Sequence, residues 1–197
     1  MDINPIKLNS PKLDKGISIM QALKNRKSER DLSDKKLSLQ HLSELLWAAN
    51  GVNREDGKRT APSALNRHTA DVYVVLQEGV YLYKPVKHQL IPIVEGDFRK
   101  LTGTQDYVYT APVNLIYVAD LDKLKDLPKP ASTDEKLKWA CIEAGHKAEN
   151  VYLYCASEGL GATTRMLIDK EKIGNTIKLR SEQIVILAQA VGYQNPI

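Results

Sequence analysis

The sequence predicts an α+β fold, in which a mixed, mainly antiparallel sheet is flanked by helices. β-rich runs come first as a hairpin over residues 71–83, and later β-rich runs are separated by helical stretches. One helical pattern, over residues 133–158, is long enough to span a small domain. A chain of 197 residues, 43% of them hydrophobic, can bury one sizeable core, so we expect a single domain over residues 1–197.

The N-terminal part predicts an extended or flexible segment over residues 1–16, followed by two helices. Ser18 can cap a first helix that ends near residue 26. A second helix is predicted over residues 38–50, because its leucines recur at three- and four-residue spacing and Gly51 follows as a stop. The side chains expected on the buried side of the first helix are Ile19, Met20, Ala22 and Leu23.

The middle of the chain predicts a long loop and then the first strands of the sheet. Residues 52–69 show no periodicity and lie between two strongly patterned regions, so we expect an ordered loop with a functional role. Strands are predicted at residues 71–77 and 80–83 around a Glu78-Gly79 turn, and at residues 88–94. A short helix near residues 96–101 and a central strand at residues 113–119 follow.

The C-terminal third predicts a connection at residues 121–130 and then the long helix. Glycines at 159 and 161 end this helix, and a short strand or turn is expected over residues 162–167. A small helix capped by Asp169 and a strand at residues 183–191 complete the prediction. The expected buried stripe of the long helix consists mostly of small side chains: Leu137, Ala140, Cys141, Ala144, Ala148, Val151, Tyr152 and Cys155.

Composition excludes several classes of protein. Residues 1–60 hold 12 Lys and Arg against 8 Asp and Glu, an excess too small for a nucleic-acid-binding surface. No apolar run approaches the roughly 20 residues that span a bilayer, so we expect a soluble protein with no membrane contact and, by default, a cytoplasmic one. A removed export signal would leave no trace. Cys141 and Cys155 are about 21 Å apart along one helix, too far to pair, and both are expected in the core.

The usual catalytic and metal-binding motifs are missing. The sequence contains no GxSxG elbow, no phosphate-binding loop, no GxGxxG fingerprint and no zinc motif. Its four histidines are scattered. We therefore expect no catalytic side chain and no metal site.

A basic cluster stands out at residues 26–30, which read Arg26, Lys27, Ser28, Glu29, Arg30. Arg26 and Arg30 lie one turn apart if the first helix continues through them, and such a like-charge pair is mildly destabilising. A phosphate would relieve this repulsion, since two guanidinium groups and a serine hydroxyl can surround its oxygens. The alternative is a solvated basic helix end that complements the helix dipole.

Four segments together resemble the nitroreductase family of flavin enzymes, in particular the branch related to SagB-type dehydrogenases. Each segment is a weak motif by itself, but all four occur in the same order, and the likeness spans about residues 18–193. The segments are Arg26–Arg30, Leu45–Gly51, Arg59–Asn66, and Glu143–His146 with Glu158–Ala162.

The resemblance implies a three-layer α/β/α sandwich that forms an intertwined homodimer with noncovalent FMN at its interface. The phosphate and ribityl hydroxyls would be held by Arg26, Ser28 and Arg30, with Lys27 nearby. The flavin ring would be lined from the second subunit by Pro62, Ser63, Ala64 and Asn66. The backbone around Arg165, Met166 and Leu167 would approach the flavin edge near N5.

Two departures from the family pattern concern the pocket and the phosphate. Family members often carry Gly where this chain has Met166 and Leu167, and Gln where it has His68, so pocket size and substrate stay open. Residues 193–197 offer none of the basic residues with which some members bind the phosphate, so Arg26 and Arg30 would do more of that work.

The activity that the resemblance implies is an FMN-dependent oxidoreductase. It would transfer hydride from NADH or NADPH through FMN to a nitroaromatic, quinone or similar small-molecule acceptor, by a ping-pong mechanism. Two alternatives stay open. One is a SagB-like dehydrogenase or oxidase whose flavin is reoxidised by oxygen, and the other is a flavin-binding protein without turnover.

Overall fold

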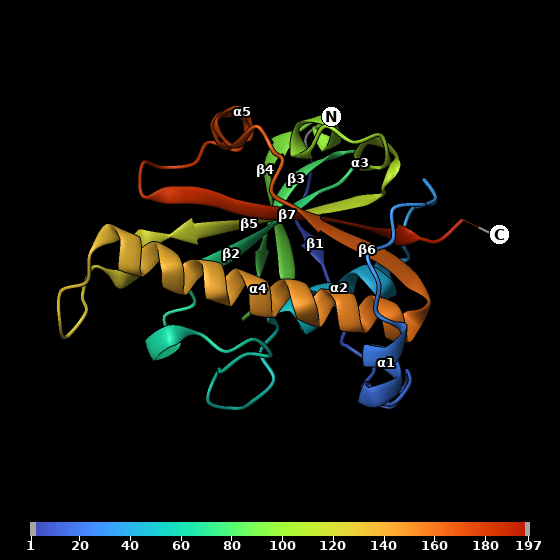
Figure 1. The fold of residues 1–197 in the computed structure, drawn as a ribbon, viewed down its shortest axis with the longest axis horizontal. Helices are drawn as coiled ribbons and strands as arrows, with labels where there is room; N and C mark the ends of the chain where they lie inside the picture. Colours follow the sequence, from blue (N-terminus) through green and yellow to red (C-terminus); the bar gives the residue numbers. More distant parts are fainter. Residues whose placement is uncertain (1–2, 196–197) are drawn as a thin grey trace.

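The computed structural model describes residues 3–195 and contains a seven-stranded sheet with the order β1-β4-β3-β2-β5-β7-β6 (Figure 1). Each pair of neighbouring strands within these residues is antiparallel. The strands are β1 (Ile6–Lys7), β2 (Ala70–Val75), β3 (Gly79–Lys84), β4 (Gln89–Glu95), β5 (Val113–Asp120), β6 (Leu160–Arg165) and β7 (Gln183–Tyr193). Residues 1, 2, 196 and 197, which belong to the expected N-terminal segment and tail, lie outside the described part.

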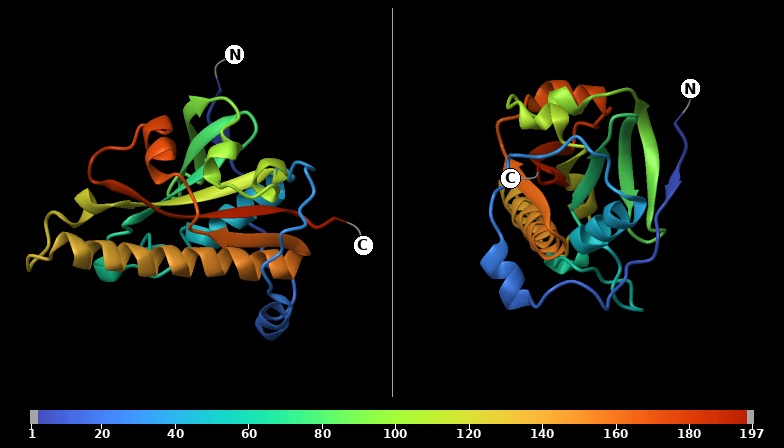
Figure 2. Two further views of the ribbon diagram at one scale, coloured as in Figure 1. Left: turned by 45° about the horizontal axis from the view of Figure 1, so that its top comes forward. Right: turned by 90° about the vertical axis from the view of Figure 1, so that its right-hand side faces the viewer.

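Helices cover both faces of the sheet and give the predicted three layers (Figure 2). Helices α2 and α4 pack on one face, where they share the larger hydrophobic core, and α5 with η2 covers the smaller core on the other face. This confirms the α+β class. The helices are α1 (Ile19–Asn25), α2 (Leu39–Asn50), η1 (Ala64–Asn66), η2 (Arg99–Thr102), α3 (Tyr107–Thr110), η3 (Leu121–Leu124), α4 (Thr133–Glu158) and α5 (Lys170–Thr176).

The elements with strong local signals lie where the sequence predicts them. The β2–β3 hairpin closes at Val75 and Val80, and all eight residues of β5 are buried, as expected of a central strand. Helix α4 begins with a capping box between Ser132 and Glu135 and ends at Gly159, whose φ of 69° is left-handed. The short pieces α3, η1 and η3 were not predicted, because helices this short carry too little periodicity.

Two predictions about burial are wrong, whereas the first helix ends close to residue 26, as predicted. Helix α1 ends at Asn25, since Arg26 has the extended ψ of 123°, so Arg26 and Arg30 are not neighbours on one helical turn. Of the four side chains expected to be buried on α1, only Ala22 is, and Met20 is 72% exposed. Cys141 is exposed, because the face that α4 buries is rotated towards Glu143 and Lys147.

Candidate functional site

The basic segment, residues 26–30, lies against the edge strand β6. Beyond the end of α1 the chain is extended, and the amide of Glu29 donates to the carbonyl of Ala162 at 2.9 Å. Gly161 permits this approach: a Cβ there would lie 2.5 Å from Cδ2 of Leu32 and 2.8 Å from Cγ of Glu29. Two of the segments that carry the family resemblance, Arg26–Arg30 and Glu158–Ala162, are therefore neighbours in one chain.

In the described part of the chain, the basic segment presents two guanidinium groups without a carboxylate partner. Within residues 3–195, neither Arg26 nor Arg30 forms an ion pair, whereas Lys27 pairs with Glu29 at 2.7 Å. The hydrogen bond from Lys27 is the main cause that lowers the pKa of Glu29, whose carboxylate also accepts the amides of Arg30 and Asp31. Arg30 and Ser28 are exposed, and Arg26 is half-buried. This donor set fits a phosphate group.

Tyr152 on α4 joins the basic segment to β6. Its hydroxyl lies 3.2 Å from Oγ of Ser28 and accepts the amide of Thr164 at 2.7 Å. The guanidinium carbon of Arg26 lies over its ring, 5.6 Å from the centroid. Sequence reasoning placed Tyr152 among core residues and missed this contact, since no local pattern links a helical tyrosine to a segment 124 residues away.

The side chain of Arg165 points away from the basic segment. Its Nε donates to the carbonyl of Thr102 at 2.8 Å, and Nη2 donates to Oγ1 of Thr102 and Oδ1 of Asn114. Burial lowers the pKa of Arg165 to about 10. The side chain is buried, and its Nη1 makes no hydrogen bond within residues 3–195. The expected contact of the Arg165 backbone with a flavin stays a prediction. Met166 and Leu167 follow at the end of β6, 67% and 63% exposed.

Residues Pro62–Asn66, which the resemblance assigns to the flavin ring and which we call the ring segment, do not lie beside the basic segment of the same chain. The ring segment flanks a cavity of about 120 Å³ beside Trp139 and Glu143, in the N-terminal half of α4. Along α4, Glu143 and Tyr152 are nine residues apart, a rise of about 13.5 Å. The fold therefore does not bring the ring segment to the basic segment within one chain. Leu65 and Asn66 both have positive φ, 51° and 56°, so this loop is held in an unusual conformation.

A buried ion pair between Glu143 and Lys147 on α4 stabilises the chain next to the ring segment. Lys147 donates to Oε1 of Glu143 at 2.6 Å and to the carbonyl of Ala70, while Oε2 of Glu143 accepts the amide and hydroxyl of Thr69 at 2.8 Å. Both charged side chains are almost fully buried. Burial raises the pKa of Glu143, but the charge and hydrogen bond of Lys147 outweigh it, so the pKa is lowered.

Ser63 and His68 complete this cluster. The amide of His68 donates to Oγ of Ser63 at 2.7 Å, and the Ser63 hydroxyl is among the groups that stabilise the Glu143 carboxylate. Burial, together with the nearby Arg59, lowers the pKa of His68 to about 4, so this imidazole is neutral at physiological pH. The ion pair of Glu143 and Lys147 was not predicted from the sequence, although a Glu followed by a Lys four residues later inside an apolar stripe is a usable signal.

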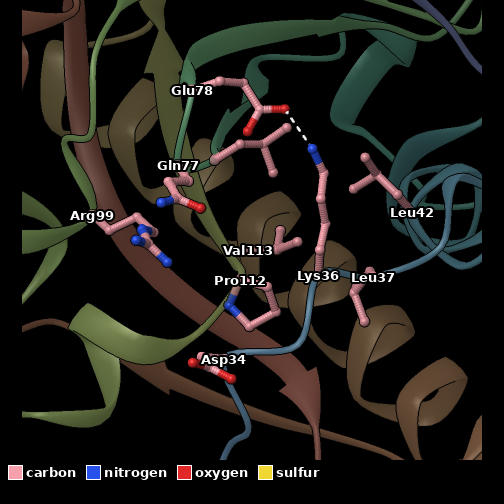
Figure 3. A pocket seen from close by; sticks show the side chains of 10 residues that line it. Asp34, Lys36, Leu37, Leu42, Gln77, Glu78, Arg99, Pro112 and Val113 are labelled. Carbon is pink, nitrogen blue, oxygen red and sulfur yellow. Dashed lines mark hydrogen bonds and ion pairs between the residues drawn. The ribbon is translucent and has the colours of Figure 1, made fainter.

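Another cavity lies between Leu37, Leu42, Pro112 and Val113 (Figure 3). Its free volume is about 40 Å³, room for little more than water. The cations at its rim are neutralised, since Lys36 pairs with Glu78 and Arg99 with Asp97. Asp34 also lines the cavity and forms no ion pair within residues 3–195, so the unpaired charge at the rim is negative and does not suit a phosphate group.

Comparison with known proteins decides the family. The model of the nitroreductase family matches residues 23–193, which include the basic segment, the ring segment and β6. The chain belongs to the nitroreductase family. The resemblance inferred from four short motifs is thereby confirmed, and flavin-dependent oxidoreduction is the chemistry that membership implies.

Relatives in the nitroreductase family match nearly the whole chain. A Methanocaldococcus jannaschii protein, provisionally named a nitroreductase, is 29% identical over 181 residues, 87% of this chain and 89% of its own. A solved structure from Ralstonia eutropha, also provisionally named a nitroreductase, is 39% identical with a TM-score of 0.91 and covers 99% of this chain and 91% of its own.

A more distant solved structure shares only the fold. A chain of the E. coli microcin synthetase complex is 20% identical with a TM-score of 0.72, and the match covers 96% of this chain and 78% of that one.

No helix in residues 3–195 has both the length and the apolar character needed to cross a bilayer.

Proposed function

We propose that this protein is an FMN-dependent oxidoreductase that transfers hydride from NADH or NADPH to a nitroaromatic, quinone or similar acceptor by a ping-pong mechanism. One observation carries the proposal: the basic segment runs beside β6, the strand whose end would face the flavin, and within residues 3–195 its Arg26 and Arg30 form no ion pair. The exposed hydroxyl of Ser28 between them adds a donor for the same anion.

FMN fits these residues by charge. Its phosphate would be bound by Arg26, Ser28 and Arg30, with Lys27 nearby. Met166 and Leu167, which directly follow β6, are exposed, so a flavin edge could be reached by the chain at this point. When bound, FMN supplies the two-electron chemistry, so the chain needs no acid or base of its own. Its residues bind the phosphate, orient the ring and set the size of the substrate pocket.

The second wall of the flavin site would come from another subunit. Within one chain the ring segment lies beside the N-terminal half of α4, away from Tyr152 and the basic segment. Large apolar side chains are exposed to solvent around α1, which precedes the basic segment, and beside the ring segment on α4. Such exposure suits a subunit interface. The exposed side chains are Ile17, Ile19, Met20 and Leu23 around α1 and Ile142 on α4. The proposal therefore includes a homodimer in which Pro62, Ser63, Ala64 and Asn66 line the ring bound by the partner.

The proposal is tested by a visible absorption spectrum of the purified protein, recorded without oxygen before and after adding NADH or NADPH. Flavin bands that bleach on addition support both the cofactor and hydride transfer. Bands that persist would contradict the use of NADH or NADPH and point to oxidation of another substrate. A colourless protein that takes up no FMN on titration would overturn the proposal.

A further inference from the structure

The hydroxyl of Tyr152 lies where two of the site segments meet. It accepts the amide of Thr164 at 2.7 Å, and the hydroxyl oxygens of Ser28 and Thr164 each lie 3.2 Å from it. The tyrosine is only 7% exposed. Its contacts are therefore made in a protected position, although Ser28 itself faces solvent.

The donors in this group can be counted. A backbone amide only donates, so the amide of Thr164 occupies one lone pair of the Tyr152 oxygen. The single proton of Tyr152 is then available to the hydroxyl of Ser28, Thr164 or Thr163. If Ser28 accepts it, the proton of Ser28 is free to point outward and to be donated to an anion. An anion at Ser28 favours this order, because it needs a donor there.

The ring of Tyr152 contacts Arg26, a second residue that is proposed to bind the phosphate. The guanidinium carbon of Arg26 lies 5.6 Å from the ring centroid, within the range of a cation–π contact. One buried side chain therefore contacts Ser28 through its hydroxyl and Arg26 through its face. It needs no contact with the anion to affect both.

We propose that Tyr152 is a positioning residue for the phosphate site: its hydroxyl donates to Ser28 and presets that side chain as a donor, while its ring holds Arg26 in place. This inference rests on the proposed binding of FMN at the basic segment. It differs from a general packing role because it affects only ligands that carry the phosphate.

The test compares FMN with riboflavin, which lacks the phosphate. The full chain and its Tyr152→Phe variant are titrated with each flavin, and Kd is measured from the quenching of flavin fluorescence. Phenylalanine keeps the ring under Arg26 and removes only the hydroxyl. We expect Kd for FMN to rise about tenfold, because Ser28 is no longer preset as a donor to the phosphate, and Kd for riboflavin to stay unchanged.

Two further variants make the test specific. Tyr154→Phe is the matched control, because the Tyr154 hydroxyl on the same helix donates to Glu44 instead. It should leave the ratio of the two Kd values unchanged. The double variant Ser28→Ala/Tyr152→Phe should bind FMN no more weakly than Ser28→Ala, since Tyr152 acts through Ser28.

Three outcomes contradict the inference. Equal weakening of FMN and riboflavin by Tyr152→Phe would mean a packing role, and unchanged binding of both would mean no role. Additive effects of Ser28→Ala and Tyr152→Phe would mean that Tyr152 does not act through Ser28. A wild-type chain that binds neither flavin would instead overturn the proposed function.

Discussion

At the scale of single residues, Glu143 and Lys147 form an ion pair in which both side chains are almost fully buried. Both charges are removed from water, and each is compensated mainly by the other. Breaking such a pair is more costly than never having it, because the remaining charge stays buried without a partner. The pair also holds Thr69, which lies just after the ring segment.

Replacement of Lys147 by Met should reduce the free energy of unfolding by about 3–5 kcal/mol, as measured by urea denaturation. The cost arises because Glu143 loses its counter-charge. The double variant Glu143→Gln/Lys147→Met is the control, since it removes both charges and keeps an acceptor for Thr69. It should recover most of the loss, and a Lys147→Met protein as stable as wild type would contradict this account.

The lowered pKa of Glu44 predicts how the free energy of unfolding depends on pH. Its side chain is buried, pairs with Lys15 at 2.6 Å and accepts hydrogen bonds from Gln40 and Tyr154. Burial raises its pKa, but Lys15 and the hydrogen bonds outweigh this and lower the pKa from 4.5 to about 2. The unfolded state therefore binds this proton more readily, so the stabilisation is complete above about pH 4.5 and is lost as the pH falls towards 2.

We expect Glu44→Gln to remove about 1–3 kcal/mol of the fall in unfolding free energy between pH 5 and pH 2.5. The measurement is chemical denaturation at a series of pH values. The exposed Glu55 offers the matched control, Glu55→Gln, which should follow the wild-type curve. A Glu44→Gln variant as acid-sensitive as wild type would contradict the assignment.

At the scale of elements, the contact between β6 and the basic segment depends on the absence of a side chain at Gly161. The extended chain after α1 passes so close to β6 that Leu32 and Glu29 occupy the space of a Cβ. This contact brings the phosphate ligands to the strand that leads to Met166. The site is therefore built from one strand edge and one irregular segment, which α4 supports through Tyr152.

Gly161→Val should weaken FMN binding at least tenfold, because the new side chain displaces the basic segment from β6. Far-UV circular dichroism should stay unchanged, since valine suits a strand. Flavin titration measures the effect. Gly174→Ala on α5 is the control, as its Cβ would meet only Cδ1 of Leu179 at 3.7 Å, an ordinary contact. Unaltered FMN affinity in Gly161→Val would show that the segment does not need this contact.

At the scale of the whole molecule, the proposed dimer can be tested by recombining two defective chains. Arg26→Ala/Arg30→Ala removes the phosphate ligands, and Ala64→Trp blocks the ring segment at an exposed position. Each variant alone should bind no FMN. In a heterodimer of the two, one site would combine the intact basic segment of one chain with the intact ring segment of the other.

Co-expression with two different tags and sequential affinity purification should therefore yield one FMN per heterodimer, measured by absorbance. If both segments served the same chain, every site would carry a defect and no flavin would be recovered. Recovery of flavin in either homodimeric variant would contradict the roles assigned to Arg26, Arg30 and Ala64.

Much of the fold was predictable because its main signals are local. The period and caps of α4, the apolar run of β5 and the β2–β3 turn each depend on residues close together in sequence. Family membership was predictable for the same reason, since four short motifs carry it. The exposed face of α1 was not, because apolar periodicity predicts a covered face without showing whether the same chain covers it.

By itself, the sequence determined the class of fold, the order of its main elements, the basic cluster and the family. Only the tertiary structure decided that the chain leaves the helix at Arg26 and runs along β6, that Arg165 turns inward, and that Glu143 and Lys147 form a buried pair. It also placed Tyr152 between Ser28 and Thr164. The physical reason is that periodicity describes which face of an element is apolar, whereas the partner of each buried polar group depends on contacts between segments distant in sequence.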